Sequence, residues 1–346
     1  MVLFQTYYNI YQYYVENIAT SYIFFSFFIF FIIYPKLIHF MNFMFAYWRP
    51  YINIKKRYGA DKPNNRTYAL VSGAGTGIGL EMVCKLLMEN INVIATSLPR
   101  DKNDFNKTVK CLIQENNLTS QVHFIGIDII AKKGAVSSAS DLLEKLDAFF
   151  NANSIDLQIL INCVGISNDY PKKFMDHEMK EIENLLNINL NFTVVLTNLI
   201  LKKYFDYDKQ CGVVFVSSQA GALPGSPLVP IYGCCKAALI HLGKTIKAED
   251  EFSNTKKPID VLIAIPGYVN SGKTPIWTNT KNGFGIASPR FIAHSILGNL
   301  GYNSPIVFSP YIVHGIQFAI LDSWLSDYII QMLSWNELKH SRKKIK

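Results

Sequence analysis

Short apolar runs alternate with longer amphipathic stretches through the middle of the chain, from residue 66 to residue 270. The runs are rich in valine, isoleucine and leucine, a pattern typical of strands that are buried on both faces. The stretches between them predict helices that begin near residues 79, 103, 137, 177 and 232. This alternation predicts an α/β fold built on a doubly wound parallel sheet. The predicted strands are 68–73, 92–97, 122–128, 157–165, 212–218 and 260–267.

The N-terminal region contains an uncharged, mostly apolar stretch from Asn17 to Pro35. At about 1.5 Å per residue, a helix of this length crosses most of the hydrocarbon of a bilayer. A cleaved signal peptide is the alternative, but residues 1–15 carry no positive charge and no small-residue cleavage site follows the stretch. The sequence therefore favours a retained transmembrane helix. Because the basic residues follow the span and only Glu16 precedes it, we expect the rest of the chain to face the cytosol.

Residues 305–335 form a second apolar stretch, interrupted by Pro310, Asp322 and Asp327. Two interpretations remain open: an element that lies at the membrane interface, and an ordinary amphipathic helix that packs on the domain. The chain ends in residues 343–346, Lys-Lys-Ile-Lys, which match the lysine-lysine-x-x pattern of membrane proteins retrieved to the endoplasmic reticulum. Together these features predict a protein of the endoplasmic reticulum membrane.

Composition narrows the classes of function. The chain has 346 residues, 49% of them hydrophobic, which suits one domain of about 250 residues with appended segments. Six cysteines lack the spacing of zinc sites and disulfide frameworks, so we expect reduced thiols and no bound metal. The net charge of +8 is concentrated in Lys55–Arg57 and in the C-terminal tail. Neither basic run is interleaved with aromatic residues, which argues against nucleic-acid binding and favours a membrane surface.

A glycine-rich turn, Ser-Gly-Ala-Gly-Thr-Gly-Ile-Gly at residues 72–79, follows the first predicted strand and opens a predicted helix. Without side chains, Gly73, Gly77 and Gly79 allow the backbone to approach a pyrophosphate. The unpaired N–H groups at the start of the helix attract such an anion. The turn therefore predicts a dinucleotide site.

The spacing of this turn resembles that of the short-chain dehydrogenase/reductase family, and further segments between residues 66 and 275 resemble it in the family's order. They are Asp128, the "INCVG" of 161–165, the "INLN" of 188–191, the "VSSQAG" of 216–221 and the "IPGYVNS" of 265–271. Cys163, Val164 and Ser271 depart from the family pattern. The resemblance implies a nicotinamide-dependent oxidoreductase with a Rossmann domain. The cofactor contacts that it implies are Gly73, Thr76, Gly77, Ile78, Gly79, Arg100, Asp128, Asn162, Gly165, Tyr232, Lys236, Pro266, Gly267, Val269 and Ser271.

Tyr232 and Lys236 are the predicted acid and its partner. The same four-residue spacing occurs at Tyr51/Lys55 and Tyr58/Lys62, so spacing alone does not identify the catalytic pair. The position of Tyr232 does, because it opens a predicted helix soon after a strand ends, where open α/β sheets bind ligands. A nearby ammonium is expected to lower the pKa of the phenol from about 10. Tyr232 is then the proton donor to a substrate carbonyl.

The resemblance implies roles for two further polar residues. Ser218 is implied to hydrogen-bond the carbonyl, Asn189 to position a water beside Lys236, and Lys236 also to hold the nicotinamide ribose. Ser218 precedes Tyr232 by 14 positions whereas the family usually has 13, so Ser217 remains an alternative. The adjacent Cys234 and Cys235 are expected only to pack the helix.

The residues after the second predicted strand bear on the cofactor. Ser97 and Leu98 stand where proteins that bind NAD present an acid, and Arg100 follows. An arginine there can pair with a 2′-phosphate, which favours NADP(H). Asp101 would reverse this preference if the loop turned it inward.

Within the family, residues 162–174 resemble the membrane-bound very-long-chain 3-oxoacyl-CoA reductases and related 17β-hydroxysteroid dehydrogenases. The resemblance implies reduction of a 3-oxoacyl-CoA to its 3-hydroxy form in fatty-acid elongation, and a homodimer. Lys172 and Lys173 are either contacts to a coenzyme A phosphate or merely solvated. Steroid and 3-ketodihydrosphingosine reduction remain rivals, as does a non-catalytic NADPH-binding scaffold.

The predicted division of the chain has three parts. They are a membrane anchor with a basic linker at 1–60, an NADP-binding catalytic domain at 61–300 and an apolar extension with a basic tail at 301–346.

Overall fold

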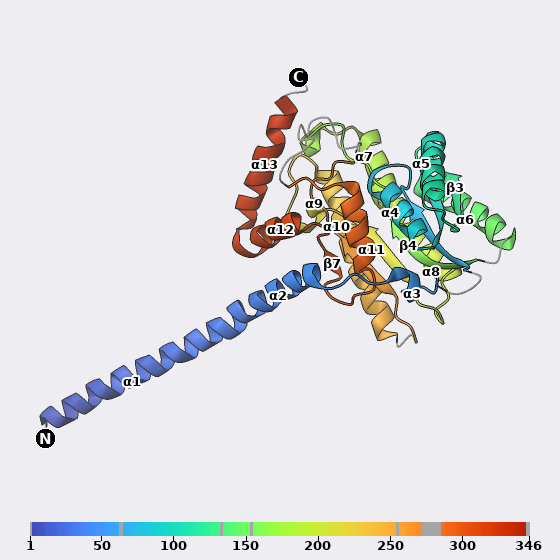
Figure 1. Ribbon diagram of the computed structural model, residues 1–346. Helices are drawn as coiled ribbons and strands as arrows, with labels where there is room; N and C mark the ends of the chain where they lie inside the picture. The colour runs from blue at the N-terminus through green and yellow to red at the C-terminus, as the bar shows by residue number, and fades with distance from the viewer. Residues whose placement is uncertain are drawn as a thin grey trace. The chain divides into compact units, whose positions relative to one another are not determined.

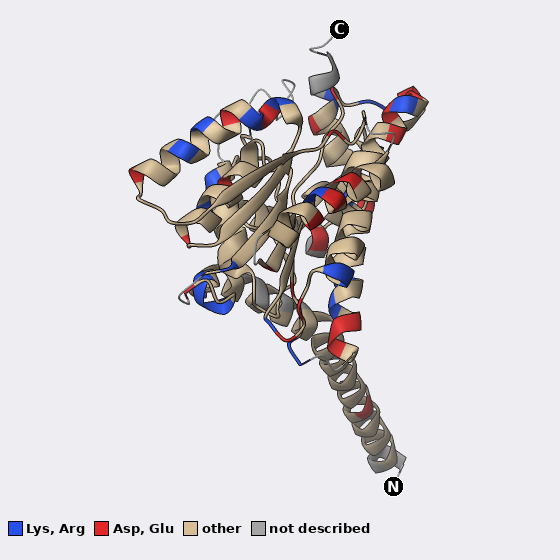
Figure 2. Ribbon diagram, turned by 90° about the vertical axis from the view of Figure 1, so that its right-hand side faces the viewer, with Lys and Arg blue, Asp and Glu red and all other residues tan. Residues whose placement is uncertain are grey.

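The computed structural model describes residues 2–61, 65–131, 134–152, 155–253, 256–271 and 285–343, and the chain divides into two compact units, Met1–Arg49 and Pro50–Lys346. The first unit is helical: α1 (Val2–Phe28), a π-helical turn η1 (Ile29–Ile33) and α2 (Tyr34–Trp48) (Figure 1). The stretch Gln5–Ile33 is long and apolar enough to cross a membrane, with a mean hydropathy of 1.7, and none of the described residues in its most apolar window is buried. Figure 2 shows α1 almost without charged residues. Met179–Lys203 passes the same test of length and composition, but it contributes to the core of the second unit.

The second unit is built on a parallel sheet with the order β3-β2-β1-β4-β5-β6-β7 among the described residues, which confirms the predicted fold class. The strands are β1 (Thr67–Ser72), β2 (Asn92–Ser97), β3 (Val122–Gly126), β4 (Asp156–Asn162), β5 (Gly212–Val216), β6 (Asp260–Ala264) and β7 (Val307–Phe308). The six predicted strands are present. The sequence pattern missed β7, which pairs with β6 through Ile263↔Val307 and Ala264↔Phe308.

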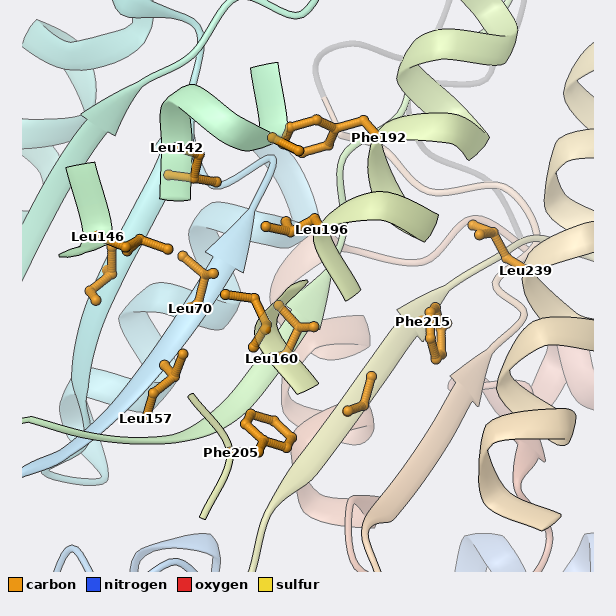
Figure 3. Close-up of a cluster of buried hydrophobic side chains, with 14 of the residues drawn as sticks. Leu70, Leu142, Leu146, Leu157, Leu160, Phe192, Leu196, Phe205, Phe215 and Leu239 are labelled. Carbon is orange, nitrogen blue, oxygen red and sulfur yellow. The ribbon is translucent and has the colours of Figure 1, made fainter. Parts of the chain in front are cut away.

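Helices cover both faces of the sheet. One face carries α4, α5 and α11, and the other carries α6, α8 and α10 (Figure 1). Figure 3 shows the apolar interior on the second face, where Leu70 and Leu160 of the sheet lie among Leu142, Phe192 and Leu196 of the helices. The helices are α4 (Gly77–Met88), α5 (Lys102–Glu115), α6 (Ala135–Ala152), α7 (Met179–Leu186), α8 (Phe192–Lys203), α9 (Gln219–Ala222), α10 (Pro230–Phe252) and α11 (Pro289–Asn299), with the short turns η2 (Pro99–Asp101), η3 (Phe174–Asp176) and η4 (Asn187–Asn191).

The second unit begins at Pro50, within the stretch 1–60 that was predicted as a membrane anchor with a basic linker. Helix α3 (Ile54–Arg57) leads into a buried polar cluster at the start of β6. Arg57 donates to both carboxylate oxygens of Asp260 at 2.5 Å, and the buried Tyr58 hydroxyl donates to Asp260 at 2.8 Å. A buried carboxylate needs such partners, so this cluster joins the segment to the amino end of the sheet.

The C-terminal extension forms β7 and two helices, α12 (Ile312–Trp324) and α13 (Asp327–Lys343), which lie together in Figure 1. Leu338 of α13 is buried against Leu228 and Val229, in a cluster that Tyr232 also contacts. Gln331 of α13 donates to the carbonyl of Pro224 at 2.5 Å. The extension therefore packs on the domain, while several of its apolar side chains stay exposed. These are Ile316, Ile320, Tyr328, Met332 and Leu333. The last three residues, with most of the lysine-rich pattern, lie outside the described residues.

Candidate active site

Tyr232 and Lys236 lie at the start of α10, next to the carboxyl end of β5. Pro230 occupies the first turn of the helix, where its fixed φ suits a helix start. The i,i+4 spacing puts both side chains on one face, and Lys236 Nζ lies 5.6 Å from the centroid of the Tyr232 ring. All six cysteines are free thiols, and Cys235 packs in the core while Cys234 is exposed.

Lys236 is a buried cation, with 4% of its surface exposed. Its Nζ donates to the carbonyl of Val216 at 2.8 Å. Burial lowers the pKa of Lys236 from 10.5 to about 8, because the charged form loses water. The ammonium therefore titrates much closer to neutral pH than an exposed lysine.

The pKa of Tyr232 is raised above 10, not lowered as expected from its proximity to Lys236. Burial is the largest cause, since it disfavours the phenolate. A hydrogen bond with Ser218 opposes the rise. The ammonium of Lys236 is directed at a backbone carbonyl instead of the phenol oxygen. The hydroxyl consequently stays protonated at neutral pH, which suits a proton donor.

The two neighbouring serines have different contacts. Ser217 Oγ is buried and donates to the carbonyl of Lys236 at 2.7 Å, so it fastens β5 to α10. Ser218 Oγ accepts from Ala220 N at 3.2 Å at the start of α9, and it lies close enough to Tyr232 to act against the rise in the pKa of the phenol. The structure therefore brings Ser218 to the tyrosine. In the segment that connects Ser218 to Tyr232, Leu228 has a positive φ of 69°.

Asn189 is fully buried in the π-helical turn η4. Its Nδ2 donates to the carbonyl of Leu185 at 3.0 Å, and its Oδ1 accepts from Ile166 N at 2.9 Å. A Cβ added to Gly165 would lie 2.9 Å from Asn189 Oδ1 and 3.3 Å from Lys236 Nζ. The backbone at Gly165 is thus the point where Asn189 and Lys236 come together, and a side chain there would crowd both.

The predicted dinucleotide contacts meet at the carboxyl edge of the sheet. Gly73 has a φ of 72°, and a Cβ there would lie 2.7 Å from Val164, in the segment after β4. Gly77 has a φ of 60°, and its Cβ would lie 3.0 Å from Ser271 Cβ, in the segment after β6. Thr76, Ile78 and Gly79 are at the start of α4, and Pro266, Gly267 and Val269 belong to the segment of Ser271.

These residues fit a nicotinamide dinucleotide. The glycine turn leaves its backbone open to a pyrophosphate, and α4 presents its free N–H groups at the same place. Asn162 Nδ2 donates to Thr197 at 2.9 Å, while its buried Oδ1 has no partner among the described residues. A buried acceptor without a partner is rare and points to a missing donor.

The turn η2 after β2 differs from the expected arrangement. Arg100 is exposed, whereas Asp101 turns inward and accepts from Ser97 Oγ at 2.6 Å. A Cβ added to Gly75 would lie 2.5 Å from Asp101 Oδ2, so the carboxylate faces the glycine turn. The acid, not the arginine, is therefore the charged group next to that turn. This is the orientation that weakens the prediction of NADP(H).

Two further predicted contacts have structural partners of their own. Asp128 Oδ1 accepts from Ile130 N and Ala131 N, each at 3.1 Å, so it stabilises the turn after β3. Lys172 is buried and its Nζ donates to Glu181 at 2.5 Å. A coenzyme A phosphate would have to displace this ion pair, which makes Lys172 unsuitable as the phosphate contact. Lys173 is exposed.

Sequence reasoning missed the contribution of the C-terminal helices. His314 of α12 contacts Gly267, and Glu337 of α13 hydrogen-bonds Tyr268. Both contacts hold the segment 266–271, although the residues that make them lie far along the chain. A histidine inside the apolar stretch 305–335 was the only sequence signal for this part of the site.

Known proteins resemble this chain at the level of family and fold. A family model described as short chain dehydrogenase matches residues 67–282. The very-long-chain 3-oxoacyl-CoA reductase of Coccidioides immitis (strain RS) is 25% identical over 281 residues, 79% of this chain and 74% of that protein. The protein of the same name from Anas platyrhynchos is 26% identical over 245 residues, 70% of this chain and 71% of that protein.

Solved structures show the same fold. A 7β-hydroxysteroid dehydrogenase superposes with a TM-score of 0.64 at 15% identity, over 82% of this chain and 99% of that chain. ElxO with bound NADP superposes with a TM-score of 0.55 at 19% identity, over 70% of this chain and 96% of that chain. At these identities the likeness concerns the architecture of the domain.

Proposed function

The chain belongs to the short-chain dehydrogenase family, a family of oxidoreductases, and from this premise we propose that it is an NADPH-dependent reductase of a lipid ketone. The substrate that we propose is a 3-oxoacyl-CoA, reduced to the 3-hydroxyacyl-CoA during fatty-acid elongation. The observation that carries the proposal is the proximity of Ser218 to Tyr232, where it acts to lower the pKa of the phenol, with Lys236 one helical turn away. The names of the very-long-chain reductases support the substrate class.

In the proposed reduction, different residues bind the cofactor and the substrate carbonyl. Gly73, Gly77 and the start of α4 would hold the pyrophosphate, and Lys236 would hold the ribose next to the nicotinamide. A bound nicotinamide supplies the hydride that the carbonyl carbon accepts. Ser218 Oγ donates a hydrogen bond to the carbonyl oxygen, on which negative charge develops.

Tyr232 gives its proton to that oxygen, so that the product is an alcohol and the tyrosine is left as a phenolate. The raised pKa of Tyr232 keeps the phenol protonated until the alkoxide, a stronger base, forms. We propose that Lys236 and Asn189, both near Gly165, return a proton to the phenolate through a water that Asn189 positions.

Asp101 favours NADH as a second candidate cofactor. Its carboxylate faces the glycine turn, where an acid accepts hydrogen bonds from a ribose diol and repels a 2′-phosphate. Arg100, although exposed, follows the same strand and supports NADPH. We propose that the balance between these two charges sets the preference for NADH or NADPH, which kinetics with both cofactors would measure.

We propose that the protein is anchored in the endoplasmic reticulum membrane by Gln5–Ile33, with its catalytic domain in the cytosol. The basic residues after the anchor and the lysine-rich end support this placement. A homodimer remains a prediction. In sealed microsomes, an added protease should remove the C-terminus from outside, whereas protection would contradict the cytosolic orientation.

A substrate panel tests the proposed function. Membranes containing the protein would be given NADPH with 3-oxoacyl-CoA, 3-ketodihydrosphingosine or a 17-ketosteroid, and oxidation of the cofactor would rank the three. We expect 3-oxoacyl-CoA to rank first. Tyr232→Phe should lower its turnover by about 10²- to 10⁴-fold while the chain stays folded.

Tyr207→Phe is a matched control, because its exposed hydroxyl bonds only the carbonyl of Leu201 among the described contacts. The control variant should keep the wild-type rate. Unchanged turnover in Tyr232→Phe would show that the assigned acid is wrong, and complementation of cells by that variant would favour a scaffold.

A further inference from the structure

A buried histidine of the C-terminal extension connects two backbone segments at the proposed site. His314 of α12 is 1% exposed. Its Nδ1 lies 3.1 Å from Gly267 N, and its Nε2 lies 2.7 Å from the carbonyl oxygen of Gly285. An amide N–H can only donate and a carbonyl can only accept, so Nδ1 accepts and Nε2 carries the proton. Both bonds together require the neutral ring.

The backbone of His314 contacts the residue that follows Ser218. Gln219, the residue after Ser218, donates from Nε2 to the carbonyl of His314 at 2.6 Å, and its own N–H donates to the carbonyl of Pro266 at 3.1 Å. A Cβ added to Gly267 would lie 2.9 Å from Gln219 Oε1 and 3.0 Å from His314 Cδ2. Gly267 is therefore held between Gln219 and His314.

We infer that His314 is a positioning residue for the nucleotide, which in its neutral form holds the segment Pro266–Ser271 against the glycine turn. This inference rests on the proposed function, because it assigns a task toward the same cofactor site. Ser271 of this segment faces Gly77, so a shift of the segment alters the wall of the nucleotide site. A protonated ring would present N–H to the N–H of Gly267, and a buried donor without an acceptor is costly.

The surroundings of the ring favour its neutral form. The N–H of Gly267, the carbonyl of Gly285 and the Tyr311 ring, 4.9 Å away in an edge-on arrangement, contact the imidazole, and none of these three groups is charged. Burial lowers the pKa of His314 from 6.5, while the bond to Gly285 raises it less. Because the pKa of His314 is lowered, we expect nucleotide affinity to be constant at pH 6.5 and above, and to fall only at a more acidic pH, where His314 gains a proton.

The test compares NADPH binding to full-length protein in detergent across a pH series, followed by cofactor fluorescence, with kcat and the KM for NADPH measured in parallel. His314→Phe removes both hydrogen bonds and should weaken NADPH binding about five- to tenfold at neutral pH, through KM more than kcat. His314→Asn keeps an acceptor for Gly267 that does not titrate. It should bind more tightly than the phenylalanine variant and lose the acid fall in affinity.

His241→Asn is the matched control, since His241 is an exposed residue of the same α10 helix that carries Tyr232. It should keep the wild-type pH profile. The inference is overturned if His314→Asn retains the wild-type fall in affinity below pH 6.5, a readout that stands even if His314→Phe does not fold. A wild-type protein that binds no dinucleotide and reduces no ketone would instead overturn the proposed function.

Discussion

At the scale of single residues, burial controls the proposed chemistry more than charge pairing does. Lys236 loses most of its hydration and hydrogen-bonds only a backbone carbonyl among its described contacts, so its pKa falls to about 8. Tyr232 loses hydration as well, so its pKa rises. The two shifts bring the amine toward neutral pH and leave the phenol as an acid.

Turnover should fall as the pH rises above about 8, because Lys236 then loses the charge that holds the ribose and assists reprotonation. The folded state releases this proton before the unfolded chain does. The free energy of unfolding should therefore increase between about pH 8 and 10.5 as far as Lys236 contributes. A pH–rate profile of ketone reduction measures the first effect, and a profile that stays flat to 10.5 would contradict it.

We expect the two neighbouring serines to have different roles, Ser218 in catalysis and Ser217 in stability. Ser218→Ala should lower kcat by about 10²- to 10³-fold, because an oxyanion donor is removed. Ser217→Ala should cost about 1 kcal/mol in the free energy of unfolding, because its bond to Lys236 is lost, with a smaller effect on kcat. Measuring kcat and urea unfolding for both variants checks this, and the reverse pattern would assign the carbonyl contact to Ser217.

At the scale of elements, we expect a short turn at the carboxyl edge of the sheet to set the preference for NADH or NADPH. The turn η2 is only three residues long, yet it decides which of two opposite charges faces the glycine turn. In this structure the inward residue is Asp101, and Ser97 holds it there.

Asp101→Asn should shift the ratio of kcat/KM values about tenfold toward NADPH, because the charge that repels a 2′-phosphate is removed. Arg100→Ala should shift the ratio the other way, or leave it unchanged if the exposed side chain does not reach the phosphate. Kinetics with both cofactors measure the ratio. A shift toward NADH in the asparagine variant would contradict the inward role of Asp101.

At the scale of the whole molecule, an apolar helix and a cofactor domain occupy separate compact units. The second unit contains the sheet, the hydrophobic core and all the proposed site residues. Within this unit, the cluster of Arg57, Tyr58 and Asp260 joins the first residues to the amino end of the sheet.

A chain that begins at Pro50 should therefore fold and reduce ketones. It should be extracted from membranes by alkaline carbonate, whereas the full chain should resist extraction, because we propose that Gln5–Ile33 spans the bilayer. Far-UV circular dichroism and the NADPH assay check the first expectation. Extraction of the full chain under the same conditions would contradict the anchor.

Local order in the sequence determined the class of fold, the six long strands, the glycine turn and the positions of Tyr232 and Lys236. These features depend on spacing within one element, such as the period of an apolar run or the i,i+4 step of a helix. The family resemblance extended them to the oxidoreductase class, which the match over residues 67–282 confirmed.

Only the tertiary structure decided which serine meets the tyrosine, which charge of η2 turns inward, and that β7 and His314 belong to the domain. The last two depend on contacts between distant parts of the chain, since His314 reaches Gly267 across 47 positions and β7 pairs with β6. The two residues of β7 are too few to show a strand period, and their pairing with β6 exists only once the sheet has formed. Periodicity reports which face of an element is buried, whereas packing determines what that face meets.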